Sequence, residues 1–321
     1  MPQGIYINYN DGRPPMTITA GLRAPSYCTS FNQRCQSDQT LTINTPLSPG
    51  SELIIVPTRP IEVIDVIDNQ VVVPTAFYIN SVTRNGNSGV IIRGANQWGY
   101  SGFTPQWAGY LMEILPASTY NSGLYVANST NFTAISNNAK LMTCQYVGRV
   151  TVNGSMRLPV SGIPFAKWSS NNVSVGFDGT NIIVRSLSYD GLDDVAGSVT
   201  MDLVIFNNTP PVAGNGITMV NRAGQVTFST VKKPFLYDRT IALTTANQAI
   251  GDKYIQLGYY GIRNKYFSGY DNIRYNGLYM YNGNVRAERN RVYGNYNVSS
   301  LRPPERNIVI PIRLLLLPNM Y

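Results

Sequence analysis

Apolar and polar residues alternate in short runs along most of the chain, and turn-forming residues separate these runs. The stretch 216–230 is the clearest example, because two alternating arms flank a turn that contains Asn221 and Gly224. Alternation with a period of two is typical of a strand with one buried face, and Asn and Gly tolerate the backbone angles of a tight turn. This stretch is therefore predicted to be a β-hairpin.

The hairpin pattern occurs twice more along the chain, at residues 4–19 and 123–136. Each copy has a glycine, two spaced apolar residues and an asparagine, followed by a second arm that ends in Ser or Thr. An apolar run that ends in a break precedes the second and third copies, at residues 110–116 and 200–207, and a similar run lies at residues 310–318. The hairpins and the apolar runs therefore recur together. We call each hairpin an opener and each apolar run a closing run.

This paired recurrence predicts three tandem modules, at residues 1–118, 119–209 and 210–321. Each module has about the size of a β-sandwich, roughly 100 residues. The alternative is that short glycine-led strands recur by chance in any β-rich chain.

Asn-Gly and Asp-Gly dipeptides predict further hairpins within the modules. Their turns are Asn85–Gly86, Asn153–Gly154, Asp178–Gly179 and Asn282–Gly283.

Composition supports this interpretation. Only 13% of the 321 residues are charged, and Asn, Gly, Thr, Ser and Tyr are abundant in place of charged residues. Such a composition is typical of a polar-faced β protein with many turns, and no segment shows the apolar stripe of a long helix. The predicted fold class is all-β, with tandem β-sandwich-like modules that each open with a β-hairpin.

Cysteine usage and hydropathy indicate a cytoplasmic place of synthesis. Cys28, Cys35 and Cys144 make an odd count, which favours free thiols, with a Cys28–Cys35 bridge as the alternative. The given sequence begins without the pattern of a signal peptide. The run Leu314–Leu317 is too short to cross a bilayer, so no membrane span is expected.

Two local clusters each leave a functional and a structural interpretation open. Trp98, Tyr100, Phe103 and Trp107 lie beside glycines, and such rings either stack on a sugar or fill a core or a subunit contact. The acidic stretch Asp190–Asp194 either binds calcium on a flexible loop or forms an exposed turn. The structural interpretation is favoured in both cases.

The third module is rich in tyrosine and arginine from residue 253 onward, and much of the net charge of +8 lies there. Tyr and Arg together form adaptable binding surfaces, and a basic surface attracts a negatively charged target such as phosphate-bearing lipopolysaccharide or an acidic protein. Packing between identical subunits is an equal alternative, whereas nucleic acid is disfavoured because no nucleic-acid-binding module is recognisable. The candidate recognition or interface residues are Tyr259, Tyr260, Arg263, Lys265, Tyr266, Arg274, Tyr275, Tyr279, Tyr281, Arg286, Arg289 and Arg291.

Catalytic chemistry is not indicated. The chain has no histidine, which removes histidine-based triads and the usual neutral-pH base. Three scattered cysteines do not form a zinc pattern, and no glycine-rich phosphate loop is present. The dense acids Asp190, Asp193, Asp194 and Asp202 lack an organised spacing, so hydrolysis of a glycan by paired carboxylates is only an alternative. We expect neither enzymatic activity nor a cofactor.

A resemblance adds to these expectations. Residues 1–8 with Asp11, Gly12 and Arg13 resemble the start of small β proteins encoded among the tail genes of siphophages. The stretch 216–229 is similar to a strand-turn-strand unit in tail-tip and tail-fibre proteins of the same phages. The resemblance implies a virion component at the distal tail, usually oligomeric and without enzymatic activity.

Together, the residues and the resemblance predict a structural or host-attachment component of a bacteriophage tail, located in the virion after synthesis in the host cytoplasm. Its expected partners are other tail proteins, further copies of itself with a trimer favoured, and a cell-surface glycan or outer-membrane protein of the host. A tail-associated glycan depolymerase and a capsid or neck structural protein are the alternatives.

Overall fold

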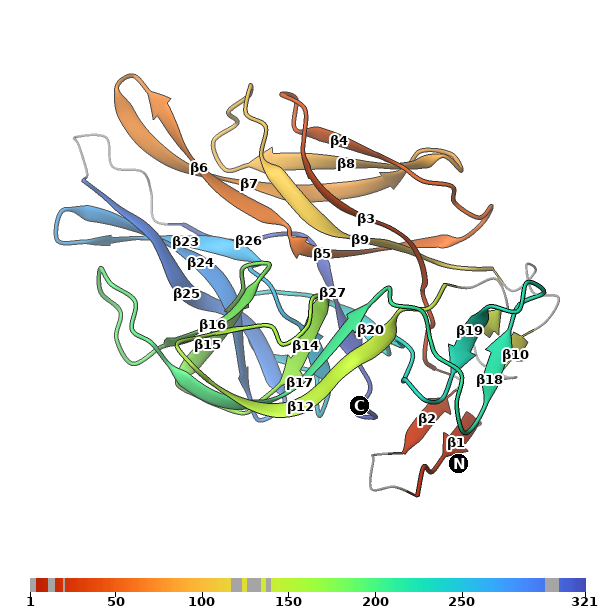
Figure 1. The fold of residues 1–321 in the computed structure, drawn as a ribbon. Coiled ribbons are helices and arrows are strands. Elements are labelled where there is room, and N and C mark those ends of the chain that lie inside the picture. Colours follow the sequence, from red (N-terminus) through yellow and green to blue (C-terminus); the bar gives the residue numbers. More distant parts are fainter. Residues whose placement is uncertain are drawn as a thin grey trace.

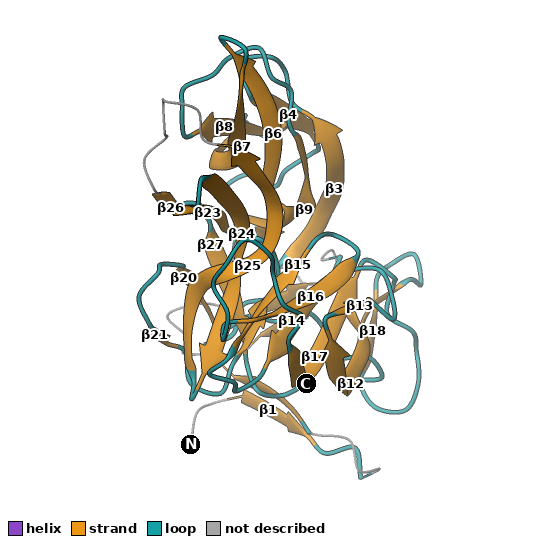
Figure 2. Ribbon diagram, turned by 90° about the vertical axis from the view of Figure 1, so that its left-hand side faces the viewer, coloured by secondary structure: helices purple, strands orange, loops and turns teal. Residues whose placement is uncertain are grey.

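The computed structural model describes residues 4–10, 15–19, 21–116, 123–125, 134–136, 140–297 and 306–321. Every regular element in these ranges is a β-strand (Figure 2). The all-β prediction is therefore confirmed. Because these ranges contain no helix, they also contain none that is long and apolar enough to cross a membrane.

The three predicted openers all form β-hairpins, each a separate two-stranded antiparallel sheet. They gather at one end of the molecule, near the N-terminus (Figure 1). Their strands are β1 (Gly4–Ile7) with β2 (Met16–Thr19), β10 (Gly123–Tyr125) with β11 (Ala134–Ser136), and β18 (Thr218–Val220) with β19 (Val226–Ser229).

The first module continues into a sandwich of two sheets, which lies at the opposite end of the molecule from β1 and β2 (Figures 1 and 2). One sheet has the order β3-β9-β5, with β3 (Ser26–Arg34), β9 (Gln106–Ile114) and β5 (Glu52–Arg59). The other has the order β4-β8-β7-β6, with β4 (Thr40–Asn44), β8 (Gly89–Asn96), β7 (Val71–Arg84) and β6 (Ile61–Asp68).

The second and third modules build two larger sheets together. The six-stranded sheet contains β12 (Thr143–Asn153), β17 (Ser198–Asn207), β14 (Ile163–Lys167), β22 (Tyr254–Gln256), β27 (Arg313–Leu317) and β20 (Arg239–Ala242), in that order. The eight-stranded sheet contains β13 (Ser155–Arg157), β16 (Asn181–Ser186), β15 (Val173–Phe177), β24 (Tyr270–Tyr281), β23 (Gly261–Phe267) and β26 (Arg306–Val309), with β25 (Asn284–Asn297) and β21 (Gln248–Ala249) branching from β24.

The strand order repeats three times along the chain. In one layer the orders are β3-β9-β5, β12-β17-β14 and β20-β27-β22, so the closing strand of each module lies between two earlier strands. In the other layer they are β4-β8-β7, β13-β16-β15 and β21-β25-β24. The predicted boundaries at 118/119 and 209/210 fall between a closing strand and the next opener. The internal repeat therefore extends from the hairpins to the sandwiches.

The second and third modules are nevertheless not independent domains, because their sheets are continuous. β14 pairs with β22 through Phe165 and Gln256, and β15 pairs with β24 through Val175 and Leu278. At the second join, a Cβ on Gly277 would lie 2.6 Å from the carbonyl oxygen of Val175. Only glycine permits this close approach of two backbones.

The segments that follow the three hairpins pair with one another and hold the modules together. Each segment forms one antiparallel β-bridge with each of the other two segments. The bridges are Arg23 with Tyr237, Ser26 with Leu141, and Thr143 with Pro234. Beside them, Phe206 packs against Phe165, Phe235 and Tyr321 at ring-centroid distances of 5.0–5.9 Å. The hairpin end therefore has its own apolar core.

Most of the predicted turns form hairpins. Asn85–Gly86, Asp178–Gly179 and Asn282–Gly283 connect directly paired strands, and the last turn has positive φ at both residues, 47° and 68°. Asn153–Gly154 was predicted wrongly. β12 and β13 on either side of it belong to different sheets, so this turn takes the chain from one layer of the sandwich to the other.

Candidate functional site

Five of the twelve Tyr, Arg and Lys residues predicted to form a recognition or interface surface lie in the interior, so for these the prediction is corrected. They are Tyr259, Tyr260, Arg274, Tyr279 and Arg289, each at most 8% exposed. The reason is their position on or beside β24 and β25, which lie against β15 and β16 of the second module. A buried tyrosine keeps its hydroxyl bonded, as Tyr260 does by donating to the carbonyl of Gln256 at 3.0 Å.

The basic residues of this group hold the acidic loop at 190–194. Asp190 lies 2.7 Å from Arg263 Nη2, 2.7 Å from Lys265 Nζ and 3.3 Å from Arg289 Nε. Desolvation opposes its ionisation, but hydrogen bonds from Arg263 and Lys265 and the charge of Arg289 outweigh it and lower the pKa of Asp190 to about 2. The cluster is therefore a structural ion network.

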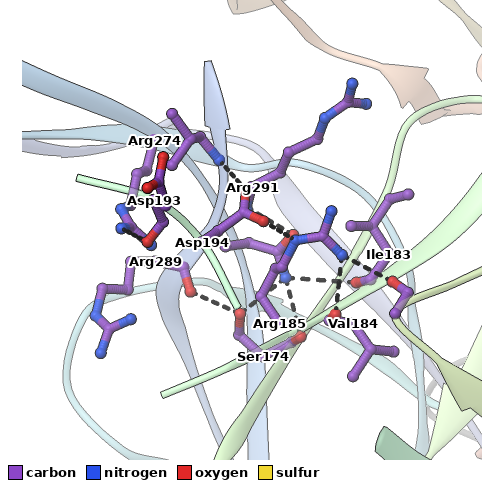
Figure 3. A network of polar contacts seen from close by, with 12 residues as sticks. Ser174, Ile183, Val184, Arg185, Asp193, Asp194, Arg274, Arg289 and Arg291 are labelled. Atoms are coloured by element: carbon purple, nitrogen blue, oxygen red, sulfur yellow. Dashed lines mark hydrogen bonds and ion pairs between the residues drawn. The ribbon is translucent and has the colours of Figure 1, made fainter. Parts of the chain in front are cut away.

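Asp194 and the backbone of Asp193 in this loop are also held by contacts (Figure 3). Asp194 accepts from Arg185 Nε at 2.5 Å and from the amide of Val292 at 2.7 Å. Arg274 donates to the backbone carbonyl of Asp193 at 2.8 Å. No group of acids, cysteines or histidines in the described ranges is arranged to hold a metal ion. These contacts favour the interpretation of the loop as a braced turn.

The remaining predicted surface residues are spread over separate places. Arg286 covers the ring of Tyr279 at 3.8 Å and pairs with Glu288 at 3.0 Å. Tyr281 is 38% exposed, and the Arg291 side chain is 50% exposed. The others, all half-buried on β23 or β24, are Arg263, Lys265, Tyr266 and Tyr275. The twelve residues therefore do not form one continuous surface.

The aromatic cluster near residue 100 divides between core and surface. Trp107 is fully buried, and its ring lies where a Cβ on Gly94 would be. Phe103 packs against Phe77 with ring centroids 5.3 Å apart. Trp98 and Tyr100 instead line a cleft between the first and third modules. The core interpretation is thus correct for part of the cluster only.

This cleft, which we call the intermodule cleft, has a volume of about 210 Å³. Its walls are mainly aromatic and aliphatic: Val73, Trp98 and Tyr100 come from the first module, and Ile262, Ile273 and Tyr296 from the third. Gln97, Asn264, Asp271 and Arg306 supply polar groups. A concave apolar site with a few polar groups is the usual form of a small-molecule site.

Contacts across the cleft fix the two modules relative to each other. Tyr296 donates to Asp65 Oδ1 at 2.7 Å. Arg306 lies over the Trp98 ring at 4.2 Å and donates to the carbonyl of Gln97 at 3.0 Å. The walls are therefore held in place by polar contacts, and the cleft is formed before any ligand enters.

Asn264 and Trp98, which line the cleft, each have a polar atom without a hydrogen-bond partner in the described ranges. Asn264 is 7% exposed, and its Oδ1 accepts no hydrogen bond from the described part of the chain. Trp98 Nε1 likewise donates none there. A buried polar group without a partner typically costs about 1–3 kcal/mol, so each such group in a folded protein calls for an explanation. Here one acceptor and one donor belong to residues that line the same cleft.

Sequence patterns indicated only part of this site. The aromatic cluster pointed to Trp98 and Tyr100, whereas Asn264 and Arg306 carried no local signal because isolated Asn and Arg residues occur throughout the module. Tyr296 belonged to the tyrosine-rich stretch, but its place at the cleft depends on the packing of the first module against the third.

The three cysteines, all within the described ranges, are free thiols. Burial raises the pKa of Cys28 to about 12 and the pKa values of Cys35 and Cys144 to about 11. Neutral thiols are poor nucleophiles, so these residues have structural roles.

A comparison with protein families places the chain. The model of a family described as "Family of unknown function (DUF6453)" matches residues 4–298. The chain belongs to this family. A search of curated proteins and a search of solved structures found no match. Because the family is described without an activity, the intermodule cleft provides the functional evidence.

Proposed function

We propose that this protein is a structural component of a bacteriophage tail, at the tip or in a fibre, and that it takes part in attachment to the host cell. The resemblance of the openers to tail-protein hairpins supports the location. The intermodule cleft is the observation that supports attachment, because an aromatic recess with polar atoms that have no partner in the described part of the chain is suited to bind a surface ligand. The cleft replaces the Tyr/Arg surface as the proposed contact with the host.

The proposed role is non-enzymatic. The chain has no histidine, and three of the four dense acids form ion pairs: Asp190 with Arg263, Asp194 with Arg185, and Asp202 with Arg149. Asp190 is therefore a weak general base, because its ion pairs lower its pKa to about 2. These pairs support binding over hydrolysis of a glycan.

The proposed partners are other tail proteins and further copies of this chain, with a trimer favoured. Apolar side chains exposed near the hairpin end support an assembly contact there, because isolated monomers seldom leave grouped apolar residues in water. Tyr6 is 65% exposed, and Ile217 and Val220 are 46% and 55% exposed. Sedimentation of the purified chain tests this part: a trimer or another closed oligomer is expected, and a stable monomer at all concentrations would contradict it.

The test of the attachment role is competition for adsorption. Purified protein, added to host cells before the phage that encodes it, should occupy receptors and slow adsorption in proportion to its concentration. An unrelated phage that uses another receptor serves as the control. Unchanged adsorption at saturating protein, together with particles from which the chain is absent by mass spectrometry, would reject the proposal. Release of reducing ends from host glycans would instead support the depolymerase alternative.

A further inference from the structure

We infer that the intermodule cleft binds a single neutral pyranose ring, the terminal or branching sugar of a cell-surface glycan. This inference rests on the proposed attachment function for its biological setting, but the binding itself is a property of the purified chain. It is carried by the volume of the cleft, the chemistry of its walls and two polar atoms, Asn264 Oδ1 and Trp98 Nε1, that have no partner among the described residues.

The volume selects the size of the ligand. Pockets for drug-sized ligands measure about 300–1,000 Å³, and a water molecule takes up about 30 Å³ in the liquid. The intermodule cleft, at about 210 Å³, is smaller than these pockets but much larger than a site for one or two waters. One sugar ring with its hydroxyl groups matches this volume, whereas a longer chain would have to extend out of the cleft.

The walls select a ligand with both apolar and polar faces. Trp98, Tyr100 and Tyr296 place three aromatic side chains around the cleft, and Ile262 and Ile273 add aliphatic surface. An aromatic ring packs well against the C–H face of a pyranose, while the hydroxyl groups at the sugar's edge need hydrogen-bond partners. A purely apolar ligand would leave Asn264 Oδ1 and Trp98 Nε1 without the partner that the described ranges do not supply.

The polar groups match hydroxyl groups in particular. Asn264 Oδ1 is an acceptor without a partner and Trp98 Nε1 is a donor without one, in both cases within the described ranges. A sugar hydroxyl donates and accepts at the same oxygen, so one small ligand satisfies both atoms. Asp271, 5% exposed, lines the cleft together with Arg306, so the lining has one acidic and one basic side chain. The formal charges of these two side chains cancel, which argues for a neutral sugar.

The expected affinity is low for one site and useful for many. A ligand the size of one sugar typically binds with a Kd of about 1 mM. Several copies of the chain on one particle, each holding one sugar of a dense glycan layer, would raise the effective affinity by about 10²–10⁴-fold. Weak binding at each single site is therefore compatible with firm attachment of a particle that has many sites.

The experiment uses the purified full-length chain and ligand-observed saturation-transfer NMR. The neutral probes are glucose, galactose, mannose, rhamnose, N-acetylglucosamine and N-acetylgalactosamine, and the charged probes are glucuronate and glucose 6-phosphate. At least one neutral sugar should receive saturation from the protein, and the charged probes should receive less. Saturation of no neutral sugar, or stronger saturation of glucuronate or glucose 6-phosphate, would overturn the inference.

Two variants locate the binding. Trp98→Phe keeps an aromatic ring and removes the indole N–H, so sugar binding should weaken about tenfold. Trp168→Phe is the matched control, because Trp168 Nε1, like Trp98 Nε1, is buried without a partner in the described chain, but Trp168 lies outside the intermodule cleft. Equal loss of binding in both variants, or no loss in Trp98→Phe, would contradict the assignment.

Asn264→Leu separates binding from folding. The change removes a buried acceptor that has no described partner, so the melting temperature should stay the same or rise. Sugar binding should fall at least tenfold, because the acceptor for a hydroxyl is gone. A variant that melts no earlier and binds sugar like the wild type would refute the role of Asn264 and with it the proposed pose.

Failure of this inference is distinguishable from failure of the proposed function. If the chain competes for adsorption but binds no neutral sugar, the attachment role stands and the ligand class is wrong. If the purified chain binds a sugar and loses it in Trp98→Phe, but neither competes for adsorption nor occurs in particles, the sugar site stands and the tail assignment is wrong.

Discussion

Replacement of Asp190 by Asn should strongly destabilise the joined sandwich of the second and third modules. The carboxylate lies within 2.7–3.3 Å of three cationic side chains, and one of them, Arg289, has only 8% of its side chain exposed. Removing the negative charge leaves these cations close together without their counterion. Loss of one partner from a buried ion pair typically costs about 3–5 kcal/mol.

The pKa of Asp190 gives a second measure of this cost. A decrease from the ordinary 3.8 to about 2 corresponds to about 2 kcal/mol of stability at neutral pH. Because Asp190 is still 28% exposed, the full cost of a deeply buried charge does not apply. We therefore expect Asp190→Asn to lower the free energy of unfolding by about 2–4 kcal/mol.

The sign of the pH dependence follows from the lowered pKa. The stabilisation from Asp190 is fully present above the unfolded-state pKa of 3.8 and is lost as the pH falls towards the folded-state pKa of about 2. The difference in stability between the wild type and Asp190→Asn should therefore be constant near neutral pH. It should shrink as the pH falls from about 4 to about 2.

Urea unfolding followed by tryptophan fluorescence measures this difference at each pH. Asp202→Asn is the matched control, because Asp202 pairs with Arg149, whose side chain is 73% exposed. An exposed ion pair is worth about 0–1 kcal/mol, so the control should lose little. A loss below about 1 kcal/mol for Asp190→Asn, or a loss that does not change between pH 5 and pH 2, would refute the structural role of the network.

Two further predictions concern the join between modules and the thiols. Gly277→Ala should lower the free energy of unfolding by about 1–3 kcal/mol, since its Cβ would meet the carbonyl oxygen of Val175; an unchanged thermal unfolding curve would contradict the close approach of β15 and β24. Cys28, Cys35 and Cys144 should react with Ellman's reagent only slowly at about pH 8 in the native state, because burial raises their pKa values. Urea should accelerate this reaction strongly, and rapid labelling of the folded chain would show that a thiol is accessible.

Local patterns in the sequence were sufficient for the strands and for most of the turns. Alternation at 216–230 and the turn residues Asn282–Gly283 act over a few residues, so a period of two and a positive φ can be read directly from them. The recurrence of openers and closing runs also indicated the repeat, because each module must bury its own closing strand between two others.

Long-range packing decided the features that the sequence did not predict. The edge pairing of β14 with β22 joins residues about 90 positions apart along the chain, and no local signal specifies it. The same applies to tyrosines such as Tyr259, which is 6% exposed and stacks on Tyr275 at 4.7 Å. Composition alone does not distinguish a tyrosine with a buried ring from one on a binding surface. Asn264 became a candidate only when its burial and its hydrogen bonds were known.

A cryo-EM map of the intact phage particle tests the central proposal most directly. The three-module chain should fit density at the distal end of the tail, with the intermodule cleft between Trp98 and Asn264 open to the outside and the hairpin end against neighbouring tail proteins. Density for the chain in the capsid or the neck would contradict the tail assignment. Density at the tail with this cleft covered by another subunit would contradict its role in attachment.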